Sequence, residues 1–161
     1  MNLVSGNLRA SEIRLGSEGG APRRPGNSPR DDEAPARQKL RVMIVEDELF
    51  VAMHLEAVLE EIGYDVTGIA SNGESALKEF SSHRPDIVLM DINLGAGMDG
   101  VTAAQQLRGY GDVQIIFVSA YNDGATKARI EAALPGSCVL SKPVTPGSLK
   151  RAIDAQAQRR H

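Results

Sequence analysis

Five polar side chains follow or end four short apolar runs of the sequence, and together they could carry out phosphoryl chemistry. They are Glu46, Asp47, Asp91, Ser119 and Lys142. Clustered carboxylates repel one another unless a cation lies among them or their pKa values rise. Oxygen ligands favour a hard ion, and Mg²⁺ is the natural occupant of such a site. Mg²⁺, an ammonium and a hydroxyl together suit a phosphoryl group, which one of the carboxylates can accept as an aspartyl phosphate.

For these side chains to meet, the apolar runs must be parallel strands of one sheet. Apolar runs that predict strands alternate with stretches that predict helices, which is typical of a parallel sheet covered on both faces. We therefore predict a doubly wound α/β domain, whose ligands bind at the carboxyl ends of the strands. The predicted strands cover 40–45, 64–70, 86–90, 114–119 and 138–141, and the predicted helices cover 49–62, 74–82, 101–108, 125–133 and 146–158.

Any one of these five residues alone would not predict a functional site. An acidic residue after a strand is usually a helix N-cap, and a serine at a strand end is usually a turn residue. A lysine before a proline usually lies at the surface. The set predicts a site because polar residues stand where four of the five predicted strands end.

The composition of the chain changes near residue 39. Residues 1–38 are rich in Pro, Gly, Ser and charged residues and predict a disordered N-terminal tail. We expect the folded domain at 39–158 and a short C-terminal tail at 159–161. The formal charge of −3 is negative because of the folded part, so the sequence does not predict a nucleic-acid partner.

The sequence carries no sign of a membrane partner or of secretion. The apolar runs are far shorter than the roughly 20 residues that cross a bilayer, and the N-terminus lacks the apolar region of a secretory signal. The one cysteine, Cys138, can form no internal disulfide, which suits a reducing compartment. We therefore expect a cytoplasmic protein.

The motifs around these residues resemble those of the response-regulator receiver family of two-component signalling. The resemblance covers about residues 40–158 and implies a flavodoxin-like fold with strand order 2-1-3-4-5. It implies a phosphoacceptor switch that catalyses only its own phosphorylation and dephosphorylation, rather than an enzyme with a separate substrate. The matching motifs, in the order and spacing of the family, are V-E-D-E at 45–48, D-I-V-L-M-D at 86–91, M-D-G at 98–100, F-V-S-A at 117–120 and S-K-P at 141–143.

The resemblance implies a role for each residue of the metal site. Asp91 corresponds to the phosphoacceptor, and it also contacts Mg²⁺. Asp47 corresponds to a direct Mg²⁺ ligand, and Glu46 to a ligand that acts mostly through water. The backbone carbonyl of Asn93 corresponds to the atom that completes the metal shell.

The resemblance also implies roles around the phosphoryl group. Ser119 corresponds to the switch hydroxyl, and Ala120 to a position kept small to leave room for the phosphoryl group. Lys142 corresponds to the invariant lysine that pairs with the phosphoryl oxygens. Pro143 occupies the position of a cis-proline.

The sequence departs from the family pattern in three places. The loop N-L-G-A-G-M-D-G, which begins at Asn93, lacks the usual proline and is one residue longer. Val139 replaces the usual switch aromatic, so coupling of the switch hydroxyl to an aromatic cannot operate. Tyr121 gives 117–121 a partial resemblance to single-domain regulators, best known in alphaproteobacteria, with an F-A-T-G-hydrophobic-Tyr motif. Asn93 and Tyr121 also match positions that tune dephosphorylation.

The family implies partners on both sides of the switch. We expect a histidine kinase or a histidine phosphotransfer protein as phosphoryl donor. Only nineteen residues follow Lys142, so we expect a single-domain regulator without an output domain. Such a regulator would bind an unknown downstream protein through the surface formed by 125–133, 138–141 and 146–158. The weak apolar pattern of 125–133 predicts a mobile helix, which suits a switch.

Three other functions fit part of the sequence. Gly95-x-Gly97-x-x-Gly100 satisfies a dinucleotide fingerprint, but it follows the third strand rather than the first and does not follow it directly. A hydrolase that forms an aspartyl phosphate usually needs a second Asp two positions after the first, where this chain has Asn93. A receiver-like binding module that takes no phosphate is disfavoured because the whole set of site residues is present.

Overall fold

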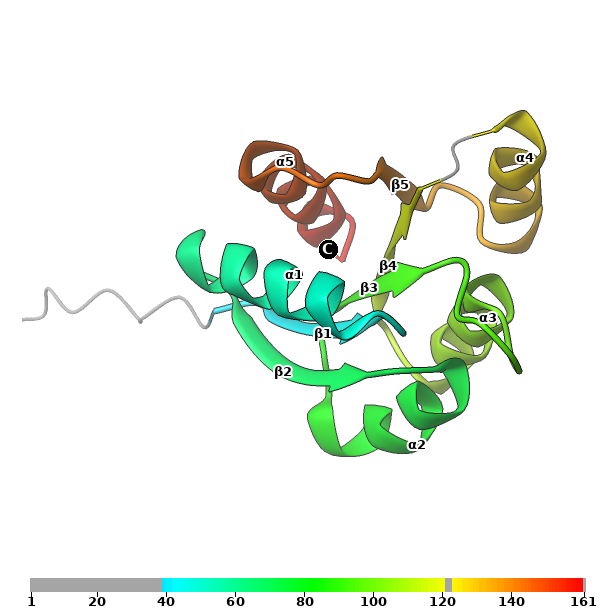
Figure 1. Cartoon of the computed structure of the whole chain (residues 1–161), viewed down its shortest axis with the longest axis horizontal. Helices are drawn as coiled ribbons and strands as arrows, with labels where there is room; N and C mark the ends of the chain where they lie inside the picture. The colour runs from blue at the N-terminus through cyan, green and yellow to red at the C-terminus, as the bar shows by residue number, and fades with distance from the viewer. Residues whose placement is uncertain (1–38, 121–122, 161) are drawn as a thin grey trace, which may run out of the picture. The chain divides into compact units, whose positions relative to one another are not determined.

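The computed structural model describes residues 39–120 and 123–160, so the predictions for the tail at 1–38 and for Tyr121 lie outside it. In the described part, five strands alternate with five helices, as the sequence predicts (Figure 1). The strands are β1 (Arg41–Val45), β2 (Asp65–Ala70), β3 (Ile87–Asp91), β4 (Gln114–Ser119) and β5 (Cys138–Ser141). The helices are α1 (Leu49–Glu61), α2 (Gly73–His83), α3 (Gly100–Tyr110), α4 (Gly124–Ala133) and α5 (Pro146–Gln158).

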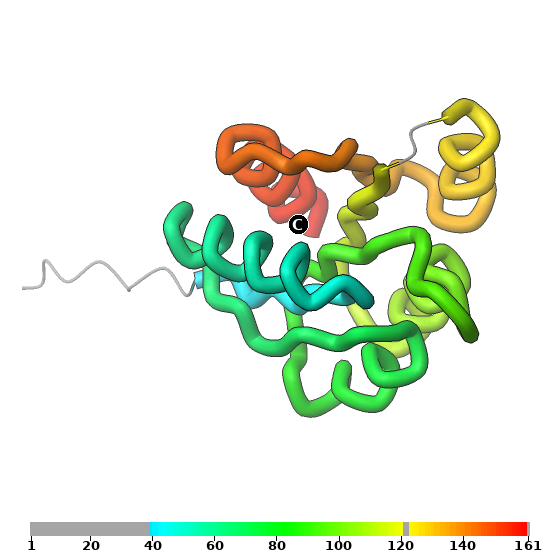
Figure 2. The backbone as a smooth tube through the Cα atoms, in the orientation of Figure 1, coloured from blue at the N-terminus to red at the C-terminus, as the bar shows by residue number. Residues whose placement is uncertain are grey.

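The strands form one parallel sheet in the order β2-β1-β3-β4-β5, which confirms the predicted doubly wound α/β fold. Helices α1 and α5 cover one face, and α2 and α3 cover the other, together with Ile130 of α4, as the smooth trace of Figure 2 also shows. Alternate residues of β1, β3, β4 and β5 enter the two cores. In β1, Val42 packs toward α1 and α5, whereas Met43 packs toward α2 and α3.

The starts of α2 and α3 are fixed by capping side chains. Asn72 accepts a hydrogen bond from Ser75 N, and Asp99 accepts from Val101 N and Thr102 N. Such caps satisfy backbone N–H groups that have no partner within the helix. They therefore set where the loops between strands and helices end.

Helix α1 exposes some of the apolar residues that its sequence pattern predicts to be buried. Leu49 and Met53, which belong to the apolar pattern that predicts this helix, are 65% and 52% exposed, and Phe50 is 85% exposed. The buried face is formed by Ala52, Val58 and Leu59, which belong to the same pattern, and by Leu55. The first turns of α1 therefore expose apolar side chains rather than bury them.

Helix α4 is held loosely, since Ile130 is its only buried residue in the described part of the chain. Polar contacts supply the rest of its attachment. Arg129 forms an ion pair of 2.8 Å with Asp99, and Gln105 Nε2 donates to the carbonyl of Ala133 at 3.4 Å. None of the helices in the described ranges is long and apolar enough to span a bilayer.

Candidate functional site

The register of the sheet brings the predicted acidic residues together. Val45 pairs with Met90, so the residues that follow them emerge side by side at the carboxyl ends of β1 and β3. Glu46, Asp47 and Asp91 each offer a carboxylate oxygen, and these oxygens lie within 4.8 Å of one another. Glu46 and Asp91 are only 2% and 5% exposed, whereas Asp47 is exposed. The three carboxylates thus form a cluster with two buried members and one that faces solvent.

Lys142 supplies the cation of this cluster. Its Nζ lies 2.8 Å from Glu46 Oε2 and 3.5 Å from Asp91 Oδ2. The backbone of the lysine is fixed by a hydrogen bond from Lys142 N to the carbonyl of Ser119, at 2.9 Å. The peptide bond that follows, to Pro143, is cis, as the resemblance implies.

Backbone N–H groups orient the two buried carboxylates. Glu48 N donates to Glu46 Oε1 at 3.2 Å, and Asn93 N donates to Asp91 Oδ1 at 3.2 Å. Each carboxylate therefore has one oxygen held by the backbone and one that faces Lys142. These contacts hold the Asp91 carboxylate in one orientation, with Oδ2 beside the ammonium of Lys142.

The electrostatics of the cluster favour an additional cation. Burial raises the pKa of Glu46 and of Asp91 above the usual carboxyl values, although Lys142 opposes the rise. Burial lowers the pKa of Lys142, but its contacts with both carboxylates outweigh that effect and raise it. One ammonium therefore does not fully compensate three carboxylates.

The donor set fits Mg²⁺. It consists of carboxylate oxygens, and the exposed Asp47 lets retained waters complete the shell of an ion that dehydrates reluctantly. The loop after β3 passes close to this position: a Cβ on Gly95, whose φ is +68°, would lie 3.2 Å from Asp47 Oδ2. A side chain at residue 95 would crowd the carboxylate that faces solvent.

Gly100, at the start of α3, packs against the backbone of the candidate phosphoacceptor. A Cβ at this position would lie 1.9 Å from the carbonyl oxygen of Asp91. The N–H of Gly100 also donates to the carbonyl of Ile92, at 3.1 Å. The glycine of the M-D-G motif thus lets α3 begin directly against the strand that carries Asp91.

The remaining predicted residues lie on the neighbouring strands. Ser119 is buried at the end of β4, and Ala120 follows it as an exposed residue. Asn93 is exposed in the loop after Asp91. Val139 is half-buried in β5, and it packs against the core on the face of α2 and α3. The modulating position predicted at Tyr121 lies outside the described residues.

Two features of the structure were not predicted from the sequence. The exposed apolar start of α1 lies directly after the acidic residues of the site, where a helix pattern alone cannot distinguish an exposed face from a buried one. The Asp99–Arg129 ion pair links the loop of the M-D-G motif to α4. Its partners are thirty residues apart, and no local pattern predicts such a pair.

The chain belongs to the response-regulator receiver family. The family model described as the response regulator receiver domain matches residues 42–154. The chain is 35% identical over 123 residues to the phyllosphere-induced regulator PhyR of Methylorubrum extorquens, and the match covers 75% of this chain and 45% of PhyR. It is 34% identical over 116 residues to the chemotaxis protein CheY of Thermotoga maritima, covering 71% of this chain and 94% of CheY.

A solved structure agrees with this assignment. The signal receiver domain of a modulated diguanylate cyclase from Desulfovibrio desulfuricans G20 matches with a TM-score of 0.70 and 37% identity, over 76% of this chain and 96% of that domain. The fold and the family therefore define a receiver domain of two-component signalling. The chain spans less than half the length of PhyR, so the similarity to PhyR concerns this domain alone.

Proposed function

We propose that this protein is a single-domain response regulator that accepts a phosphoryl group on Asp91 from a phosphohistidine. The observation that carries the proposal is the position of Asp91. Its carboxylate is buried beside two further carboxylates that suit Mg²⁺, and its Oδ2 lies 3.5 Å from Lys142 Nζ. Receiver domains act as phosphoacceptor switches rather than as conventional enzymes, and this arrangement suits that role.

In the proposed reaction, an oxygen of Asp91 attacks the phosphorus atom of the donor. The P–O bond forms as the P–N bond to the imidazole breaks, and the bonding electrons leave with the imidazole nitrogen. Glu46 and Asp47 would hold Mg²⁺ together with Asp91 and the carbonyl of Asn93, and the ion would supply charge neutralisation at the phosphoryl oxygens. The hydrogen bond from Asn93 N keeps the attacking carboxylate oriented.

The phosphorylated state is proposed to be detected by Lys142 and Ser119. Lys142 Nζ exchanges its contact with Asp91 for the phosphoryl oxygens, and the hydroxyl of Ser119 moves to bind them. Ala120 leaves room for the group. Because Val139 cannot act as a switch aromatic, the change is passed to the surface of α4, β5 and α5 by the backbone of β4 and by α4 itself.

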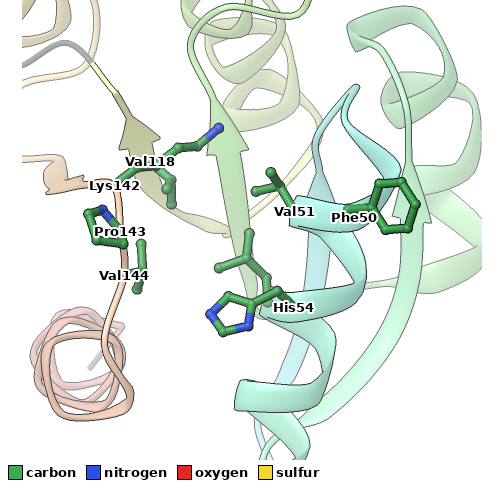
Figure 3. Close-up of a pocket in the computed structure, with 8 residues that line it drawn as sticks. Phe50, Val51, His54, Val118, Lys142, Pro143 and Val144 are labelled. Carbon is green, nitrogen blue, oxygen red and sulfur yellow. The ribbon is translucent and has the colours of Figure 1, made fainter.

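The phosphoryl donor is proposed to bind the exposed apolar start of α1. A protein donor must bring its histidine to Asp91, so it must cover the surface around the site. That surface includes Leu49 and Phe50 and a pocket of about 450 Å³ between α1 and the loop after β5. Figure 3 shows Val51 and His54 of α1 on one side of this pocket and Val144 on the other.

A phosphotransfer assay tests this function. Radiolabelled phosphate on a purified histidine phosphotransfer protein should move to this chain in the presence of Mg²⁺, and Asp91→Asn should abolish the transfer. Phe50→Ala should slow transfer from the protein donor roughly tenfold or more without slowing transfer from acetyl phosphate, because burial of a large aromatic contributes about 1.5–3 kcal/mol. Tyr110→Ala, which also removes an exposed aromatic ring, is the control. Transfer that survives in Asp91→Asn would refute the proposal.

A further inference from the structure

A groove lies at the amino ends of β1 and β3, whereas Asp91 lies at the carboxyl end of β3. It consists of two adjoining hollows of about 650 and 390 Å³, which share Arg84, Asp86 and Arg160. Each hollow has the size of sites that bind small molecules, which is typically about 300–1,000 Å³. We refer to the two hollows together as the amino-end groove.

Positive charge exceeds negative charge in this groove, although residues 40–161 carry more acidic than basic residues. The lining includes three carboxylates, and two of them, Asp86 and Asp112, balance the two arginines of the second hollow, so the excess of positive charge lies in the first hollow. The cations outnumber them by one, and three of the cations form no ion pair within the described ranges. The lining cations are Lys39, Arg41, Arg84 and Arg160.

The guanidinium of the fourth cation, Arg160, has hydrogen-bond partners for only some of its nitrogen atoms. Its Nη1 pairs with Asp86 Oδ1, and the other oxygen of Asp86 accepts a hydrogen bond of 2.8 Å from Arg41 N. Arg160 Nε is buried and has no hydrogen-bond partner among the described residues. Because Nε is itself buried, a ligand in the groove can meet only the exposed part of this side chain, which is 27% exposed.

Arg84 stands in a backbone conformation that usually belongs to glycine. It caps the end of α2 with φ 43° and ψ 58°, and it is the only non-glycine residue of the described part with a positive φ. A side chain there costs roughly 1–2 kcal/mol relative to the ordinary conformation. The strained residue is one of the cations that line both hollows of the groove.

An exposed aromatic ring lines the second hollow. Tyr110, the last residue of α3, is 66% exposed. Its ring packs against the ring of Phe80, with 6.4 Å between the ring centroids, and this contact supports its orientation. An exposed, supported ring near a group of cations suits a ligand with a flat base at one end and a phosphate at the other.

We propose that the amino-end groove binds a nucleoside phosphate. The phosphate contacts Arg84 and Arg160, and the base stacks on Tyr110. The site is separate from the phosphoacceptor, because β3 runs from the groove at Ile87 to Asp91 at its other end. Binding there does not depend on phosphorylation, so this proposal and the proposed function can fail independently.

Binding is measured on the full chain with Asp91→Asn and a chelator present, so that neither phosphorylation nor a metal-bound nucleotide contributes. The probes are the common ribonucleoside monophosphates, ribose 5-phosphate and inorganic phosphate, each titrated by calorimetry and by chemical shift. At least one nucleotide should bind roughly tenfold more tightly than ribose 5-phosphate, since a stacked base contributes about 1–3 kcal/mol. Equal binding of these two ligands, or no nucleotide binding at millimolar concentration, would overturn the proposal.

Arg84→Gly separates loss of the ligand from loss of the fold. Glycine relieves the positive φ, so this variant should unfold at the same or a higher temperature than the parent while its nucleotide affinity falls about tenfold or more. Lys78→Ala, which removes an exposed cation from the same helix, should leave binding unchanged. Tyr110→Ala should remove the preference for the nucleotide over ribose 5-phosphate. Unchanged nucleotide affinity in Arg84→Gly would refute the site.

Discussion

Lys142 Nζ lies 2.8 Å from Glu46 Oε2, although 96 positions of sequence separate the two residues. The same nitrogen lies 3.5 Å from Asp91 Oδ2. The lysine therefore compensates two buried carboxylates from two neighbouring strands. A cation in this position can move from carboxylate to phosphoryl oxygen over a short distance, which suits a switch.

Lys142→Met tests this relationship. The substitution keeps an unbranched side chain one atom shorter but leaves Glu46 and Asp91 without their cation, so phosphorylation by acetyl phosphate should slow about a hundredfold, as for loss of a group that stabilises transition-state charge. The rate of mass gain measures it. Lys150→Met, which removes an exposed lysine paired with Asp154, is the control. Equal rates in the two variants would show that Lys142 has no part in the reaction.

The buried carboxyls predict how stability depends on pH. Burial raises the pKa of Asp91, so in the metal-free protein its protonated form favours folding below the ordinary carboxyl pKa of about 4, and that contribution is lost as pH rises through the raised pKa. Asp91→Asn carries no such charge. It should therefore gain stability relative to the wild type as pH rises above about 4, and Mg²⁺ should reduce the difference. Thermal unfolding at several pH values, with and without Mg²⁺, measures this; a difference independent of pH would contradict it.

Two glycines of α3 form a matched pair. Gly100→Ala places a Cβ against the carbonyl of Asp91 and should destabilise the protein by about 3 kcal/mol or more, since the obstacle is backbone. A Cβ at Gly109 meets nothing within 4 Å, so Gly109→Ala should stabilise by about 0.5–1 kcal/mol. Urea unfolding of both variants gives the comparison. A small effect of Gly100→Ala would mean that α3 can shift freely from β3.

Helix α4 should exchange its amide hydrogens faster than α5, because Ile130 is its one buried residue in the described structure. Asp99→Asn keeps a capping side chain on α3 but removes the ion pair with Arg129, so exchange in α4 should rise up to about fivefold, as for a surface pair of 0.2–1 kcal/mol. Asp154→Asn, which breaks an ion pair on α5, should leave α4 unchanged. Exchange in α4 as slow as in α5 would contradict a mobile switch helix.

The order of elements was predictable because the strands are short apolar runs, and polar residues stand where four of the five end. The positions of Glu46 and Asp91 followed from those ends alone, and the sheet order confirms the arrangement. The exposed Phe50 was not predictable, since apolar residues near the start of a helix look alike whether a core or a partner covers them. The contact between Lys142 and Glu46 depends on how far a long side chain reaches across two strands, which sequence spacing does not specify.

The central claim is that Asp91 accepts the phosphoryl group in a site that needs Mg²⁺. The most direct measurement is the intact mass of the full chain after incubation with acetyl phosphate. The wild type should gain the mass of one phosphoryl group with Mg²⁺ and none with a chelator, and Asp91→Asn should gain none under either condition. An unchanged gain in Asp91→Asn, or no gain in the wild type with Mg²⁺, would contradict the account.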